Sequence, residues 1–151
     1  GAGRARRASR TGHPPTSAKV KALRRKVRAD SVQAGSDVNK AGAPDRVVGT
    51  SKTLRALARI AGAAPSADGR YAVRALERKR VRALTLRLAE MTTAERSQLS
   101  GVSAGRAPQM LAGAIVAEAA MDLLDIERLD ICPWALREGV ILRRLDWISA
   151  G

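Results

Sequence analysis

Apolar residues recur along this chain with the spacing of helices, interrupted by short runs that are typical of strands. A three-to-four-residue spacing over 17–32 predicts a helix whose other face is strongly basic, and a loop is predicted over 33–44. Residues 46–48 are expected to form a short strand. The helical spacing returns over 54–61, and Gly62 is a typical C-terminal stop for that helix.

The second half of the chain contains its longest apolar stretch. Residues 71–91 are predicted to be mostly helical, and the capping box Thr92 to Glu95 opens a short helix that Gly101 ends. Pro108 to Leu124 predicts a helix that is apolar over most of its surface, which is typical of a buried helix. Its one narrow polar stripe consists of Glu118, Asp122 and Asp125.

The pattern closes with a strand and a further helix. Residues 129–131 suit a short strand, Pro133 ends it by removing a backbone donor, and 136–141 open a helix. Because both predicted strands lead into helices, we expect 46–48 and 129–131 to be parallel neighbours in one small sheet. The helix from Pro108 should then be the most buried element. The fold class is therefore α/β.

The composition suits one domain. The chain has 151 residues, 45% of them hydrophobic, with no Phe and only 2% aromatic residues, so the core must consist of Leu, Val, Ile and Ala. No apolar run approaches the ~20 residues of a membrane span, and no charged-then-apolar signal segment is present. The single cysteine, Cys132, cannot form an internal disulfide. We therefore expect a cytoplasmic protein without a membrane partner.

The formal net charge of +14 leaves two interpretations open. It favours a polyanionic partner, such as nucleic acid, polyphosphate or an acidic membrane face, and a coding bias toward Arg and Ala explains it equally well. Residues 1–16 contain four arginines and no acid, which predicts a disordered basic arm or the remnant of a truncated lobe. Residues 17–151 form the folded part. His13 has no second ligand nearby and is expected to be exposed.

The strongest candidate site is the turn Gly49-Thr50-Ser51-Lys52-Thr53 between the first predicted strand and its helix. A helix N-terminus attracts phosphate through its unpaired N–H groups and its dipole. Gly49 would let the backbone approach a ligand, the three hydroxyls add donors, and Lys52 adds positive charge. The alternative is that Thr50 or Ser51 merely caps the helix. The pattern is not a Walker loop.

Arg106 is the second candidate. It lies in a glycine-containing loop before the buried helix, where a guanidinium can grip phosphate with two N–H groups. The alternative is an ion pair with Glu95 or Glu138 that fixes this loop. Trp134 and Trp147 flank the last predicted helix and are expected to pack on the sheet or on a partner lobe.

An ordered set of motifs across residues 45–145 resembles a known family. The motifs are Val48-Gly49-Thr50-Ser51-Lys52-Thr53, Thr92-Thr93-Ala94-Glu95-Arg96, Arg106-x-x-x-Met110-Leu111-Ala112-Gly113 and Ala135-Leu136-Arg137-Glu138-Gly139. Their order resembles the second lobe of the exopolyphosphatase/guanosine pentaphosphate phosphatase family. This implies the C-terminal lobe of an actin-like, ribonuclease H-like phosphohydrolase, a small sheet flanked by helices, with the turn from Gly49 facing the inter-lobe cleft.

The resemblance also implies an activity. Such enzymes release terminal phosphate from inorganic polyphosphate, or the 5′ phosphate from guanosine pentaphosphate, with a divalent metal, usually Mg²⁺. In the family a Glu base and a glycine-rich phosphate loop with an Asp perform this chemistry, and neither has a counterpart in this sequence. We therefore assign no catalytic residue and no metal ligand. The chain is expected to be an inactive fragment that lacks the first lobe.

The expected phosphate-binding residues are Gly49, Thr50, Ser51, Lys52, Thr53 and Arg106. The expected partners are inorganic polyphosphate or guanosine pentaphosphate, the missing N-terminal lobe and, in a homodimer, a second copy. Two alternatives stay open. One is a basic nucleic-acid-binding protein, although the chain has no set of stacking aromatic residues. The other is a non-catalytic regulatory module built from such a lobe.

Overall fold

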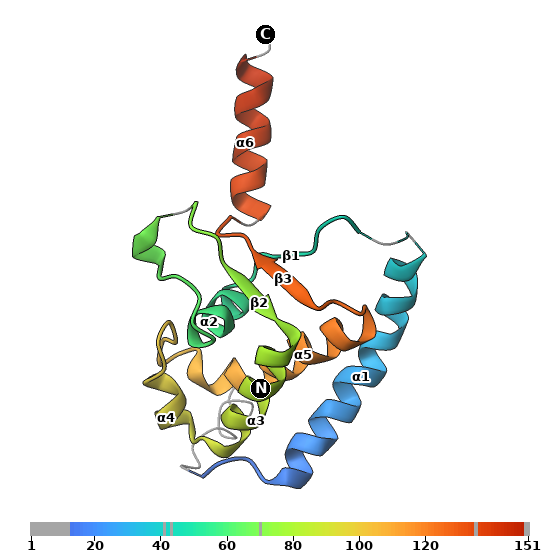
Figure 1. Cartoon of the computed structure of the whole chain (residues 1–151), viewed down its shortest axis with the longest axis vertical. Helices are drawn as coiled ribbons and strands as arrows, with labels where there is room; N and C mark the ends of the chain where they lie inside the picture. The colour runs from blue at the N-terminus through green and yellow to red at the C-terminus, as the bar shows by residue number, and fades with distance from the viewer. Residues whose placement is uncertain (1–12, 41, 43, 70, 135, 150–151) are drawn as a thin grey trace, which may run out of the picture.

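Helices flank a small sheet in the computed structural model, which describes residues 13–40, 42, 44–69, 71–134 and 136–149 (Figure 1). The elements in chain order are α1 (Ser17–Asn39), β1 (Val48–Gly49), α2 (Lys52–Ile60), η1 (Ser66–Asp68), β2 (Ala75–Glu77), α3 (Arg78–Glu90), α4 (Thr93–Ser97), η2 (Ala107–Gln109), α5 (Met110–Leu123), β3 (Arg128–Ile131) and α6 (Leu136–Ser149). Residues 1–12 of the predicted basic arm lie outside the described residues. Among the described helices, none has the length and apolarity to cross a membrane.

The sheet has the order β1-β3-β2. Strand β1 pairs with β3 in parallel, with Val48 opposite Asp130, so the predicted parallel neighbours are confirmed. Strand β2 runs antiparallel to β3 along its other edge. The prediction of a helix over 71–91 is therefore wrong for its first part, since β2 covers 75–77 and α3 begins only at Arg78. A three-residue strand is too short to show a period of its own, and only its pairing with β3 reveals it.

Only one face of the sheet belongs to the core. Leu129 and Ile131 are buried, whereas Arg128, the first residue of β3, is exposed and Asp130 is half-buried. On the outer face Asp130 accepts hydrogen bonds from Arg46 at 2.7 Å and from Arg128 at 3.3 Å. This alternation is the ordinary consequence of the two-residue period of a strand.

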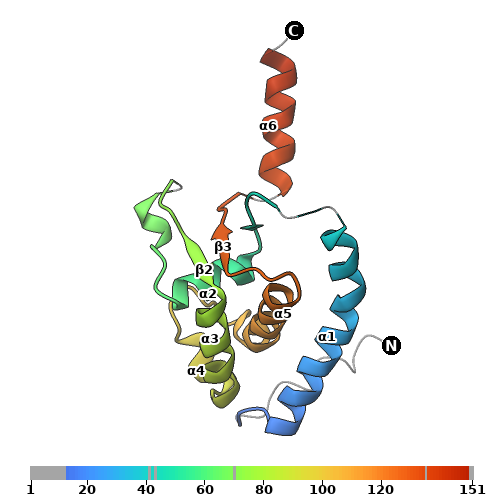
Figure 2. The same cartoon turned by 45° about the vertical axis from the view of Figure 1, so that its right-hand side comes forward.

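Helix α5 is the centre of the fold, as expected from its sequence. It lies between α3 and α1 (Figure 2). Its buried residues are Met110, Leu111, Ala114, Ile115, Ala117, Ala119 and Met121. A Cβ added at Gly113 would stand 2.3 Å from Thr53 Cγ2, so glycine at this position is what lets α2 approach α5 so closely.

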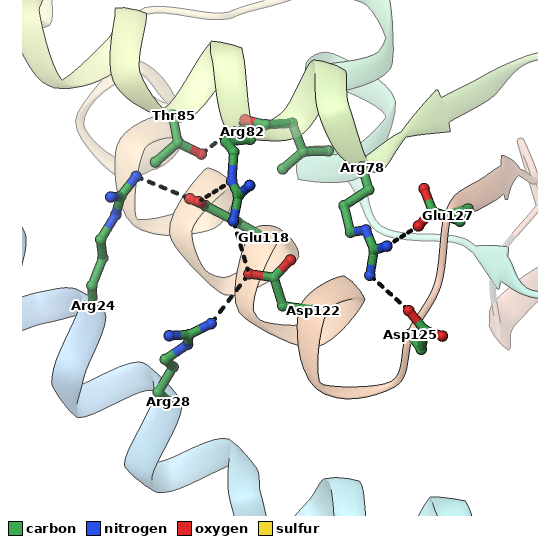
Figure 3. A network of polar contacts seen from close by, with 10 residues as sticks. Arg24, Arg28, Arg78, Arg82, Thr85, Glu118, Asp122, Asp125 and Glu127 are labelled. Carbon is green, nitrogen blue, oxygen red and sulfur yellow. Dashed lines mark hydrogen bonds and ion pairs between the residues drawn. The ribbon is translucent and has the colours of Figure 1, made fainter.

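The polar stripe of α5 is paired with arginines from both neighbouring helices (Figure 3). Glu118 binds Arg24 of α1 at 3.1 Å and lies 3.7 Å from Arg82 of α3. Asp122 lies 3.3 Å from Arg28 of α1 and 3.9 Å from Arg82. We call these five residues the arginine–carboxylate network. At the end of α5, Asp125 binds Arg78 at 3.0 Å, and Arg78 also pairs with Glu127.

The helix ends differ from the predictions in two places, at the C-terminus of α1 and at the C-terminus of α4. Helix α1 continues to Asn39, so the prediction of a loop over 33–44 is wrong for 33–39. The helix continues because each residue added to an existing helix gains one backbone hydrogen bond. Its cap is Thr16, whose hydroxyl accepts from Lys19 N at 3.4 Å. Helix α4 ends at Ser97, and Gly101, with φ of 79°, belongs to the turn beyond it.

The capping box of α4 is confirmed. Thr92 N donates to Glu95 at 2.6 Å, and Glu95 N donates to the Thr92 hydroxyl at 3.2 Å. The hydrogen bond from the Thr92 backbone lowers the pKa of Glu95. Nearby, buried Arg96 donates to Leu88 O at the C-terminus of α3, and its burial lowers its pKa. Together these contacts fix the turn between α3 and α4.

Candidate anion-binding pocket

A pocket of about 680 Å³ lies at the edge of the sheet where β1 and β3 end. Helix α2 starts at this edge directly after β1, Pro133 follows β3, and Arg74 precedes the antiparallel β2. The loop that contains Gly101 and Arg106 contributes the remaining wall. Open α/β sheets bind ligands outside the carboxyl ends of their strands, so the pocket lies at the expected place for a ligand.

The lining of this pocket is strongly positive. Five of its lining residues are cations, and none of the lining residues is Asp or Glu. The cations are Lys52, Arg55, Arg59, Arg74 and Arg106. We call this site the basic pocket. Several like charges around one concave surface produce a local positive potential, which attracts anions and concentrates them there.

Backbone carbonyls hold two of the arginines in place. Arg55 donates to Pro133 O at 3.0 Å, which ties α2 to the end of β3. Arg59, one turn further along α2, donates to Ala63 O at 3.0 Å. A carbonyl orients a guanidinium without neutralising its charge, and one such bond uses only one of its five N–H groups. Both arginines therefore keep charge and donors for an anion.

Arg74 organises the wall opposite α2. Its Nε donates to Ala64 O at 2.8 Å, and its two terminal nitrogens donate to Ala72 O at 3.1 Å, to Gly69 O at 2.9 Å and to Pro65 O. One guanidinium thus collects four carbonyls from residues 64–72. The shape of this loop, which contains η1, depends on Arg74, and its positive charge again meets no carboxylate among these partners.

The residues of the predicted turn from Gly49 to Thr53 have different roles. Lys52 lines the basic pocket, whereas others in the turn pack against neighbouring side chains or cap α2. Ser51 Oγ accepts from Leu54 N at 3.0 Å, so Ser51 is the N-cap of α2. Gly49 is buried, and a Cβ there would stand 2.7 Å from Leu54 Cδ1 and 2.8 Å from Leu129 Cδ2, so packing requires glycine. Thr53 lies against Gly113 at the contact between α2 and α5.

Of the six predicted site residues, the basic pocket brings together Lys52 and Arg106. Thr50 is exposed beside the start of α2. Arg106 is half-buried, and within the described part of the chain no ion pair joins it to Glu95, which binds Thr92 instead. The side chain of Glu138 lies outside the described residues. Phosphate binding by the six residues stays a prediction.

Three of the five pocket cations, Arg55, Arg59 and Arg74, were not predicted from the sequence. Lys52, Arg55 and Arg59 are spaced i, i+3 and i+7, which places them on one face of α2, and this spacing is a signal that sequence inspection can use. Arg74 has no comparable signal. Its place in the pocket depends on a loop that folds around its own side chain, and on the short strand that follows it.

The pocket fits an anion rather than a metal ion. Among the described residues, no group of three or more His, Cys, Asp and Glu stands where it could hold a metal. His13 is exposed. Magnesium prefers carboxylate and carbonyl oxygens, and the basic pocket is lined by cations. Fold and site together define an α/β domain with a basic pocket at the carboxyl edge of its sheet.

The family follows from comparison with known proteins. The model of the Ppx/GppA phosphatase family matches residues 1–147, and the chain belongs to this family. Exopolyphosphatase 1 of Mycobacterium leprae is 51% identical over 146 residues, which are 97% of this chain and 43% of that protein. The chain thus spans less than half the length of the curated relatives it matches.

Solved structures of the family share the fold. An exopolyphosphatase from Cytophaga hutchinsonii superposes with a TM-score of 0.74 at 18% identity, over 91% of this chain and 45% of that chain. The Aquifex aeolicus member of the Ppx/GppA family gives a TM-score of 0.70 at 23% identity, over 88% of this chain and 42% of that one. The expected fold, an α/β lobe of the actin-like class, is therefore confirmed.

Proposed function

We propose that this chain is the phosphate-holding part of a phosphohydrolase that releases terminal phosphate from inorganic polyphosphate or guanosine pentaphosphate. The observation that carries the proposal is the basic pocket, with five cations and no acidic lining residue at the carboxyl edge of β1 and β3. The name of the mycobacterial relatives, Exopolyphosphatase 1, favours polyphosphate over the guanosine compound. Family membership does not favour the nucleic-acid-binding alternative.

The pocket residues supply charge neutralisation and orientation. Arg55, Arg59 and Arg106 present planar forks of N–H donors that match phosphate oxygens, and Lys52 adds a point charge at the start of α2. Positive groups fixed in advance around a phosphoanhydride stabilise the negative charge that develops during its cleavage. Arg74 keeps the loop opposite α2 in position for the same anion.

The attack by water needs groups that the pocket lacks. A general base for hydrolysis must accept a proton, and no lining residue of the basic pocket is Asp, Glu or His. We propose that the base, and a bound Mg²⁺, belong to the part of the family protein that this chain does not span. The 151-residue chain should then bind its substrate without hydrolysing it. A cytoplasmic location and a homodimer also remain proposals.

The binding test compares two double variants that remove equal charge. Lys52→Ala with Arg106→Gln empties the basic pocket of two cations, whereas Lys21→Ala with Arg80→Gln removes two exposed cations from α1 and α3. We expect the pocket variant to lower the affinity for tripolyphosphate at least ~tenfold, since hydrogen bonds to charged groups contribute about 1.5–3 kcal/mol each. Calorimetric titration at fixed ionic strength measures this difference.

A duplex oligonucleotide titrated in the same buffer separates specific from general binding. Non-specific polyanion binding depends on total charge and falls steeply with salt. Equal losses in both double variants, or equal losses for both ligands, would show that the pocket is not a phosphate site. The activity assay is independent: metal-dependent phosphate release by the chain alone, abolished by the pocket variant, would contradict the assignment of the base and metal to the missing part.

A further inference from the structure

Of the described residues that line the basic pocket, only Lys52 carries a primary amine, since the other four cations are arginines. Arginine stays protonated in proteins, whereas a lysine amine can form a covalent bond with an electrophilic carbon. Lys52 is the first residue of α2, and it is exposed. The pocket therefore places one chemically reactive group among four that only bind and orient anions.

Part of the pocket wall is apolar. Its apolar lining residues are Ala56, Ala63, Ala64, Ile131 and Pro133. Inorganic phosphate has no apolar part that could contact such a wall. The volume of about 680 Å³ is also much larger than a single phosphate group. A ligand that joins a phosphate to a short apolar group therefore matches both parts of the lining, since small-molecule sites combine apolar walls with a few polar groups.

Two other lysines have a different environment. Lys26 of α1 pairs with Asp30, and Lys79 of α3 pairs with Glu77, each at 3.2 Å. A carboxylate beside an amine repels an anionic reagent that approaches it. In the described lining of the basic pocket there is no carboxylate, so no acidic side chain there repels an anion that approaches Lys52.

On the basis of the phosphate binding proposed above, we propose that Lys52 is acylated by acyl phosphates, the mixed anhydrides of a carboxylic acid and phosphate. The arginines bind the phosphate group, and the acyl group lies against the apolar wall. The unprotonated amine of Lys52 attacks the acyl carbon. The bond from this carbon to the phosphate oxygen breaks, phosphate leaves with the bonding electron pair, and the nitrogen releases a proton to water.

The pocket favours this transfer in two ways. Binding holds the reagent beside the amine, so the reaction no longer depends on a chance encounter in solution. The guanidinium groups of Arg55 and Arg106 stabilise the negative charge that develops on the departing phosphate. The product is an amide, which removes the charge of Lys52. The acylated pocket should therefore bind phosphate compounds more weakly, so the supply of acyl phosphate regulates the site.

The test treats the 151-residue chain with acetyl phosphate and measures the acetylation rate of each lysine by peptide mass spectrometry. Lys52 should react at least ~tenfold faster than Lys21, an exposed lysine of α1 outside the pocket lining. The acetyl ester of N-hydroxysuccinimide, which carries no phosphate, should modify both lysines at similar rates. Arg106→Gln should slow the reaction of Lys52 with acetyl phosphate several-fold, whereas Arg80→Gln, which removes an exposed charge from α3, should not.

The effect of the modification is measured separately. After acetyl phosphate is removed, the treated parent should bind tripolyphosphate several-fold more weakly than the untreated parent. The same treatment should leave the affinity of Lys52→Arg unchanged, because that variant keeps the charge but has no amine at this position. A similar loss of affinity in treated Lys52→Arg would show that other lysines cause it, and would overturn regulation through Lys52.

Tripolyphosphate titration of the untreated chain separates this proposal from the proposed function. If tripolyphosphate binds but Lys52 and Lys21 react equally with acetyl phosphate, the acylation proposal is wrong and phosphate binding stands. The same preference for Lys52 with the phosphate-free ester also overturns it, because the reactivity then belongs to the amine alone. If tripolyphosphate does not bind to the pocket, the proposed function is wrong, and acylation through the pocket is wrong with it.

Discussion

Two arginine-rich regions of this protein use the same side chain in opposite ways. In the arginine–carboxylate network, Arg24, Arg28 and Arg82 meet two carboxylates on α5, which are only 12% and 19% exposed (Figure 3). In the basic pocket, five cations share a hollow without a lining carboxylate. The network joins three helices, whereas the pocket presents charge that nothing in the lining balances.

The difference shows that the partner of an arginine, rather than its presence, indicates its role. A guanidinium bound to a carboxylate from a neighbouring helix is neutralised and stabilises that contact. A guanidinium held by a carbonyl, like Arg55 or Arg59, is oriented but stays charged. Cations grouped without a counterion repel one another, so an anion that binds there stabilises the folded chain by mass action.

The largest effect is expected when the network is broken. Glu118→Gln removes the charge that Arg24 and Arg82 share, inside a contact where the carboxylate is mostly buried. We expect a loss of about 2 kcal/mol in the free energy of unfolding, the scale of a hydrogen bond between charged groups after allowance for the partly exposed arginines. Urea denaturation measures it.

A substitution in the basic pocket should have a much smaller effect on the free energy of unfolding than Glu118→Gln. Arg106→Gln removes a charge that the network does not use, so its free energy of unfolding should stay within about 0.5 kcal/mol of the parent. Tripolyphosphate should stabilise Glu118→Gln as much as the parent. If Arg106→Gln destabilises the chain as much as Glu118→Gln, the two regions do not differ in the way proposed.

A smaller effect is expected from Arg74→Lys. An ammonium group keeps the charge but cannot reach the four carbonyls that Arg74 gathers, so the loop should loosen at a cost of about 1 kcal/mol. Tripolyphosphate affinity should fall several-fold although the charge is retained. Arg59→Lys is the matched control, because Arg59 makes one carbonyl bond that lysine can replace. Equal behaviour of the two variants would refute a positioning role for Arg74.

The smallest effect concerns Asp130 on the outer face of the sheet. The hydrogen bond from Arg46, helped by Arg128, lowers the pKa of Asp130 below its ordinary value. A lowered folded-state pKa contributes stability above the unfolded value, and this contribution is lost as the pH falls through the folded value. Asp130→Asn should therefore reduce the acid sensitivity of unfolding below about pH 4, with Asp30→Asn as the surface control. Identical acid profiles for parent and Asp130→Asn would contradict it.

The local pattern of the chain determined most of its elements. The buried helix from Pro108, the capping box at Thr92 and the strand at 129–131 are all where the pattern predicts them, because each depends on residues a few positions apart. The ordered motifs also predicted the family correctly. From the predicted site, Lys52 and Arg106 could be named, since a helix start and a glycine-containing loop are visible in the sequence.

Only the tertiary structure decided what depends on distant residues. Strand β2 exists because β3 offers an edge for it, and Arg74 reaches the pocket because β2 begins there. Gly49 proved to be a packing requirement set by Leu54 and by Leu129, and Leu129 lies eighty residues away in the sequence. Which arginines are paired and which stay available was likewise fixed by how α1, α3 and α5 come together, because charge balance is a property of neighbours in space.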